Sequence, residues 1–130
     1  MSKKMMLPLL LLAALLGMTL PALAADKPPI AVAAEGQTAA VQVSKLAARA
    51  PFFLFFDATG GLVEAVANPY QRTAGGAGPQ VVEFLAARGV KTVIAGEFGA
   101  QMTAAMKAKG MIFRTASGNV AEAVKSVITK

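Results

Sequence analysis

The order of apolar and polar segments predicts an α/β fold built on one mixed sheet. Five short apolar segments are typical of strands, and each of the last three is followed by a segment with apolar residues at helical spacing. Two helix–strand units in succession, marked by the related sequences A-R-G-V at 87–90 and A-K-G-M at 108–111, indicate parallel strands. The turn A-T-G-G at 58–61 indicates a hairpin, and therefore one antiparallel pair.

The predicted strands are short, and the clearest is an aromatic run. Residues 51–57, P-F-F-L-F-F-D, combine strong strand formers with an Asp that ends them. Asn68-Pro69 closes the strand that returns from the hairpin. The full set of predicted strands is 30–34, 51–57, 62–67, 92–95 and 111–115. Residues 35–49 are polar and Ala-rich without a clear period, so we expect a loop there, with a short helical turn within 43–48.

Three predicted helices carry an apolar stripe on one face. The first begins at Pro79, a residue suited to the first helical position, and ends at Gly89. The second covers 100–109 and ends at Gly110. The third follows Asn119, which forms a capping-box pattern with Glu122 three residues on. The inward-facing residues are Val81, Val82, Leu85, Ala86, then Met102, Ala105, Met106, and then Val120, Ala123, Val124, Val127 and Ile128.

This order places all three helix starts at one edge of the sheet. Crossover connections make the third, fourth and fifth strands parallel, so each helix begins at the carboxyl end of a strand. The loop 35–49 follows the first strand and opens at the same edge. Open α/β sheets bind ligands outside the carboxyl ends of their strands, so this edge is where we expect a binding site.

The first 24 residues have the features of a secretory signal peptide. Lys3 and Lys4 precede the apolar run 7–20, and P-A-L-A at 21–24 contains an A-x-A cleavage site. The alternative, an uncleaved membrane anchor, is disfavoured because the run is shorter than the ~20 apolar residues that span a bilayer. The sequence therefore predicts cleavage after Ala24, a periplasmic or secreted protein, a stiff linker at 25–29 and one domain at 30–130.

The composition excludes several kinds of chemistry. The chain has no Cys and no His, which removes disulfides, thiolate-held iron–sulfur clusters, the usual zinc sites and the Ser-His-Asp triad. Its 7 acidic residues are spread along the sequence without a close carboxylate pair. The 11 basic residues beyond the leader are scattered rather than clustered. These patterns argue against an enzyme, a nucleic-acid partner and, after signal cleavage, a membrane partner.

The sharpest candidate for ligand binding is the glycine-rich segment G-G-A-G-P at 75–79, which leads into the first predicted helix. Glycines let backbone N–H groups approach a ligand, and the start of a helix attracts negative charge. Arg72 and Thr73 add a cation and a hydroxyl. The spacing matches neither the dinucleotide fingerprint nor the P-loop, and a flexible turn is the alternative interpretation.

Three further features are weaker candidates. G-E-F-G at 96–99 is a second glycine-bracketed helix start or simply a tight turn, and S-G-N at 117–119 acts mainly as a helix cap. Met102, Met106 and Met111 carry the sulfur that soft metals bind. Their helical spacing instead favours packing in the core.

Four stretches of the chain resemble the dinitrogenase iron–molybdenum cofactor biosynthesis family. They are S-K-L-A-A-R-A-P-F-F (44–53), N-P-Y…G-G-A-G-P (68–79), G-V-K-T-V-I-A-G-E-F-G (89–99) and A-K-G-M-I-F…S-G-N-V-A-E-A-V (108–124). The resemblance covers nearly all of the chain after the leader. It implies a three-layer α/β/α, ribonuclease-H-like fold with a mixed five-stranded sheet, and a non-catalytic role in binding a metallocluster or a similar anionic cargo.

The chain departs from the family's usual first loop, which often has the form S-P-R-F-G-R-A-P-Y-F. Ser44, Arg49, Ala50, Pro51 and Phe53 match that pattern, whereas residues 45–48 do not, and no Cys or His is present as a cluster ligand. The implied cargo, an iron–molybdenum-type or iron–sulfur cluster or another anion, would be held without such ligands. The predicted binding residues are Arg49, Arg72, Thr73, Gly75, Gly76, Gly78, Gly96 and Gly99, with no catalytic and no metal-ligating residue. The alternative is a scaffold domain that binds a protein partner and has lost ligand binding.

Overall fold

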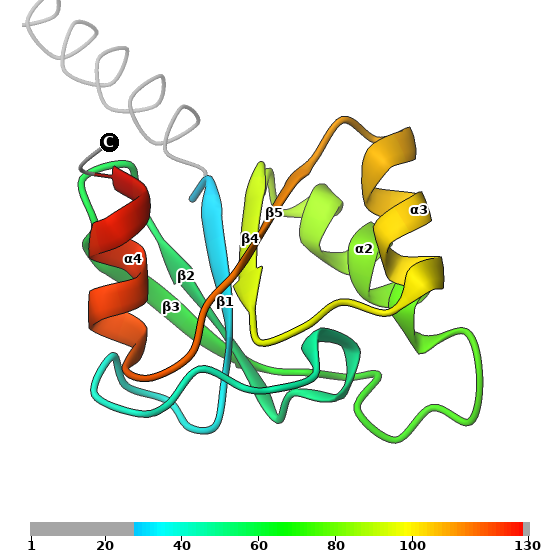
Figure 1. Cartoon of the computed structure of the whole chain (residues 1–130), viewed down its shortest axis with the longest axis horizontal. Helices are drawn as coiled ribbons and strands as arrows, with labels where there is room; N and C mark the ends of the chain where they lie inside the picture. The colour runs from blue at the N-terminus through cyan, green and yellow to red at the C-terminus, as the bar shows by residue number, and fades with distance from the viewer. Residues whose placement is uncertain (1–27, 129–130) are drawn as a thin grey trace, which may run out of the picture.

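The computed structural model describes residues 28–128 and confirms an α/β fold with one five-stranded sheet (Figure 1). The strands lie in the order β3-β2-β1-β4-β5. The elements in chain order are β1 (Ile30–Ala34), the 3₁₀ helix η1 (Ala47–Arg49), β2 (Phe52–Phe56), β3 (Leu62–Ala67), α2 (Ala77–Ala87), β4 (Thr92–Ala95), α3 (Ala100–Ala108), β5 (Ile112–Thr115) and α4 (Val120–Ile128).

The pairing of the strands gives the sheet one reversed member. β2 runs antiparallel to both of its neighbours, β1 and β3. β4 runs parallel to β1 on one side and to β5 on the other. β1, β3, β4 and β5 therefore all point the same way, which confirms the predicted hairpin and the predicted parallel strands.

Helices cover both faces of the sheet, so the fold has the three layers that the family resemblance implies. Figure 1 shows α2 and α3 on one side of the sheet and α4 on the other. Phe53 and Phe55 of β2 pack in the core beneath α2 and α3. Leu54 and Phe56 point the opposite way and pack in the core beneath α4. The three methionines named above belong to the first of these cores, which confirms their predicted packing role.

Two boundaries differ from the sequence-based expectation. α2 begins at Ala77, so Pro79 is its third residue and not its first. The reason is Gly76, whose left-handed backbone (φ 72°) turns the chain into the helix earlier, while Pro79 still falls among the first-turn N–H groups that need no helical partner. The helical turn expected within 43–48 lies at Ala47–Arg49, at the very end of its loop.

The hairpin between β2 and β3 is held by one carboxylate. Asp57 accepts hydrogen bonds from the backbone N–H and the hydroxyl of Thr59 and from the backbone N–H of Gly61. These bonds lower the pKa of Asp57 below its usual range, and the bond from Gly61 has the largest effect. Desolvation acts in the opposite direction. The carboxylate thus supports the turn above its ordinary pKa and loses this contribution as the pH falls through the lowered value.

The predicted signal peptide (1–24) and residues 25–27 of the predicted linker lie outside the described residues. Within residues 28–128, none of the helices has the length and apolar character needed to cross a membrane.

Candidate functional site

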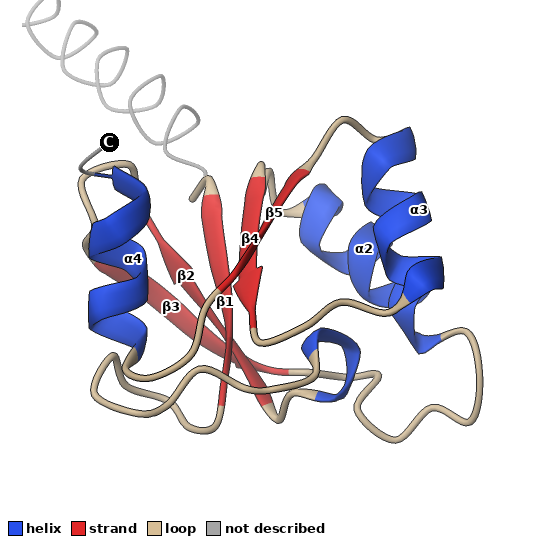
Figure 2. Ribbon diagram, in the orientation of Figure 1, coloured by secondary structure: helices blue, strands red, loops and turns tan. Residues whose placement is uncertain are grey.

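The carboxyl edge of the sheet collects the loops and helix starts, as the sequence predicted. α2, α3 and α4 follow the ends of β3, β4 and β5, and Figure 2 shows the connecting loops gathered at that end of the molecule. The loop after β1 lies along the same edge because backbone hydrogen bonds join it to the segment after β5 and to the segment after β4. Val43 N–H donates to Gly118 O (2.7 Å), and Ala47 N–H donates to Glu97 O (3.1 Å).

Arg49 joins the end of this loop to the segment that precedes α2. Its Nη1 donates to the carbonyl oxygens of Gln71 (3.0 Å) and Thr73 (2.5 Å). Arg49 and Thr73, both predicted site residues, are therefore in direct contact. Arg72 lies between the two residues whose carbonyls accept these bonds; it is exposed and forms no ion pair with any described residue.

The starts of α2 and α3 lie side by side. A Cβ atom on Gly78 would stand 2.9 Å from Cβ of Met102 and 3.1 Å from its backbone N, so the missing side chain lets the two helices approach. Gly75, Gly76 and Gly99 face open space, with nothing within 4 Å of an added Cβ. The backbone N–H groups of Ala77 and Gly78 have no hydrogen-bond partner among residues 28–128. The glycine-rich segment thus presents free donors close to two helix N-termini.

Gly96 allows a close contact between two backbone segments. A Cβ atom there would lie 2.7 Å from both Cα and O of Lys45, and its own N–H donates to Ser44 O (2.8 Å). Its amide is already used, and the glycine allows two backbone segments to touch. Gly96 is therefore a packing position, while Gly99, three residues on, remains open.

The first three N–H groups of α4 already have hydrogen-bond partners. Asn119 caps α4 by accepting hydrogen bonds from the N–H groups of Ala121 (2.8 Å) and Glu122 (3.3 Å), as predicted. Val120 N–H donates to Val41 O (2.9 Å). α4 also lies on the opposite face of the sheet from α2 and α3, so only two of the three helix starts can act together.

A cleft of about 650 Å³ opens at the same edge, between the loop after β1 and the segment after β5. Of the eight predicted site residues only Gly96 lines this cleft. The other residues that line it are Gln42, Val43, Lys45, Thr115, Ala116, Ser117 and Gly118. Sequence reasoning considered Ser117 and Gly118 only as a weaker candidate that acts mainly as a helix cap, and it assigned the other five to no site. Their position in the chain could have indicated the cleft, because Lys45 and Ser117 both belong to connections that follow the carboxyl end of a strand.

The donor set at this edge suits an anion and not a bare cation. Among residues 28–128 no group of three or more His, Cys, Asp or Glu side chains could hold a metal ion. Besides the carboxylates of Glu35 and Glu97, the edge offers backbone N–H groups, guanidinium and ammonium groups and hydroxyls. These groups fit the oxygen or sulfide surface of a negatively charged cargo through hydrogen bonds, and they supply no dative bond to iron.

Several solved structures are similar to this one. The apo form of the orange protein from Desulfovibrio gigas is 28% identical, with a TM-score of 0.73, covering 80% of this chain and 88% of that chain. A Thermotoga protein described as a NifB protein of the DUF35 family is 33% identical, with a TM-score of 0.66, covering 77% of this chain and 86% of that chain. PH0822 is 24% identical (TM-score 0.65; 77% and 89% covered), a likeness that shows the fold alone. No curated protein sequence matches the chain.

The family comparison agrees with the four stretches that carry the resemblance. The family model described as dinitrogenase iron–molybdenum cofactor matches residues 28–130, which is every residue after the predicted signal peptide and residues 25–27. This chain therefore belongs to the dinitrogenase iron–molybdenum cofactor family.

Proposed function

We propose that this chain binds and carries an anionic cargo, a metallocluster or an oxyanion, at the carboxyl edge of its sheet without catalysing a reaction. Family membership supports a binding role, and so does the likeness to the orange protein, whose structure is of an apo form. The observation that carries the proposal is the contact of Arg49 with the carbonyls of Gln71 and Thr73. It holds a guanidinium against the segment that leads into α2, a helix whose first N–H groups are free.

The chemistry of this edge makes the binding reversible. A hydrogen bond to a charged partner contributes about 1.5–3 kcal/mol, so a few of them reach micromolar affinity. The chain has no Cys or His to form a coordinate bond. Because the attraction acts largely between exposed charges, we expect affinity to fall as salt is added.

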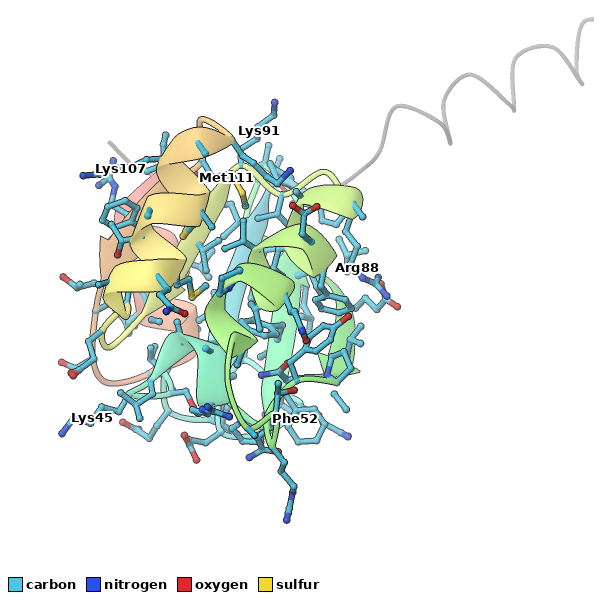
Figure 3. The ribbon with its side chains drawn as sticks, turned by 90° about the vertical axis from the view of Figure 1, so that its right-hand side faces the viewer. Lys45, Phe52, Arg88, Lys91, Lys107 and Met111 are labelled. Carbon is cyan, nitrogen blue, oxygen red and sulfur yellow. The ribbon has the colours of Figure 1, made fainter. Side chains whose placement is uncertain are left out.

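The test is calorimetric titration of the protein with molybdate, phosphate and a nitrogenase-type cluster at two salt concentrations. Arg72→Ala should weaken binding and flatten its salt dependence, because one exposed cation is lost. Gly75→Val should weaken binding about tenfold by covering the approach to the backbone, with space for the new side chain. Gly78→Val is unsuitable, since its side chain would strike Met102. Lys107→Ala, at the far end of α3, is the control for loss of one charge (Figure 3).

Absence of heat with all three anions would contradict the proposal, as would equal binding by Gly75→Val and the parent. The second candidate function, a scaffold domain for a protein partner, would then be the better one. A specific observation favours it: β3 is an edge strand in which Leu62 and Val63 are 44% and 52% exposed. Exposed apolar side chains on an unpaired strand edge are typical of strand-addition interfaces.

We also propose that the protein acts outside the cytoplasm. The support is Lys3 and Lys4, the apolar run 7–20 and the A-x-A site that ends at Ala24. N-terminal sequencing of protein isolated from cells should begin at Ala25. A chain that begins at Met1 or Ser2 in the soluble cytoplasmic fraction would contradict export.

A further inference from the structure

We propose that the cleft lined by Lys45, Ser117 and Gly118 is a separate binding site for a tetrahedral oxyanion, free or carried by a small molecule as a phosphomonoester. We call it the Lys45 cleft. It shares no residue with the start of α2, although both lie at the same edge of the sheet. The proposal therefore does not depend on the nature of the family's cargo.

The Lys45 cleft is built before any ligand arrives. Its two walls, 42–45 and 115–118, are joined by the hydrogen bond from Val43 N–H to Gly118 O (2.7 Å). The floor is fixed by two more, from Gly96 N–H to Ser44 O (2.8 Å) and from Glu97 N–H to Lys45 O (2.6 Å). Because these bonds hold the walls in place, little ordering cost remains for binding.

The charge in the Lys45 cleft is not compensated within the described chain. The ammonium of Lys45 forms no ion pair there, neither with Glu97 beside it nor with any other carboxylate between residues 28 and 128. Glu35, the acidic residue at the start of the same loop, accepts a hydrogen bond from the buried hydroxyl of Ser44. Lys45 is exposed, and its ammonium is therefore available to an anion that enters the cleft.

The opposite wall supplies neutral donors. The backbone N–H groups of Ser117 and Gly118 and the hydroxyl of Ser117 have no hydrogen-bond partner among the described residues. Gly118 has a φ of +87°, and an added Cβ would meet nothing within 4 Å, so the ligand side of this wall is open. An exposed lysine on one wall and amide and hydroxyl donors on the other together match the several acceptor oxygens of a phosphate-like group.

The size and lining of the Lys45 cleft allow more than a bare ion. About 650 Å³ lies within the range of small-molecule sites and exceeds what one tetrahedral anion fills. Val43 and Ala116 give part of the lining an apolar character. A phosphomonoester could place its charged end at Lys45 and its organic part against these two side chains.

The experiment is a titration of ¹⁵N-labelled protein, followed by amide NMR, with inorganic phosphate in one arm and glycerol phosphate in the other. The Ser117 and Gly118 amides should shift in a saturable way in at least one arm. Tighter binding of glycerol phosphate would identify the phosphomonoester as the ligand, and equal binding would identify the free anion. Lys45→Gln should weaken binding about tenfold or more. Lys91→Gln, which removes a charge at the opposite end of the molecule, should leave it unchanged (Figure 3).

The outcomes separate this site from the one at α2. Shifts confined to Gly75, Gly76 and the start of α2 would support the proposed function and overturn the Lys45 cleft as a site. Shifts confined to Ser117 and Gly118 would do the reverse. Equal affinity in Lys45→Gln and Lys91→Gln, or no saturable shift in either arm, would also overturn it.

Discussion

Replacing Phe55 by alanine is expected to lower the free energy of unfolding by about 3–5 kcal/mol, the usual cost of removing a buried phenylalanine ring. Phe55 is fully buried on the α2 face of β2. Its ring lies edge-on to Phe84, with centroids 6.5 Å apart, and the guanidinium of Arg88 stands 5.2 Å from its centre. The truncation therefore leaves a cavity and also removes an aromatic and a cation–π contact, and urea or thermal unfolding measures the loss.

Two further variants make this test specific to the described packing. Val124→Ala removes two methyl groups from the core on the other face of the sheet, so it should destabilise by a smaller amount than Phe55→Ala. Val63→Ala, on the exposed edge strand, should change stability by less than about 0.5 kcal/mol. If Phe55→Ala and Val124→Ala unfold like the parent protein, β2 and α4 do not pack as described.

The run that contains Phe55 shows where sequence reasoning stops. An aromatic run without alternation identified β2 correctly but could not say which side chains face which layer. The structure explains this: both faces of the sheet are covered, so both sets of side chains are apolar and the period of two disappears. In the helices only one face is buried, and there the periodicity predicted Val81, Leu85, Met102 and Val124 as core residues.

The carboxyl edge of the sheet shows the same limit. That the helix starts gather there followed from chain order alone, because crossover connections put them at the carboxyl ends of parallel strands. The role of each glycine did not follow, because it depends on contacts between distant segments. Gly78 touches Met102 and Gly96 touches Lys45, whereas Gly75 and Gly99 are open, and nothing in the local sequence distinguishes the two pairs. The Lys45 cleft was missed for the same reason, since its walls are about 70 residues apart in the chain.

Gly96→Ser is the second substitution for which we expect a large effect, a loss of at least about 2 kcal/mol of stability. The added Cβ would stand 2.7 Å from both Cα and O of Lys45, and backbone atoms cannot move aside as the end of a flexible side chain can. Separation of the two segments would stretch the hydrogen bonds from Gly96 to Ser44 and from Glu97 to Lys45. Denaturant unfolding of the purified variant measures the loss.

Gly99→Ser is the matched control, because it makes the same chemical change three residues further on. Gly99 is the N-cap of α3, with an extended backbone and open space around it, and serine is a favoured N-cap residue. This variant should be as stable as the parent or slightly more stable. Gly96→Ser should also weaken phosphate binding in the Lys45 cleft, because it displaces the backbone that carries Lys45, whereas Gly99→Ser should not. Equal stability of the two serine variants would mean that the loop after β1 does not lie against β4 as described, and the floor of the Lys45 cleft would then be lost with it.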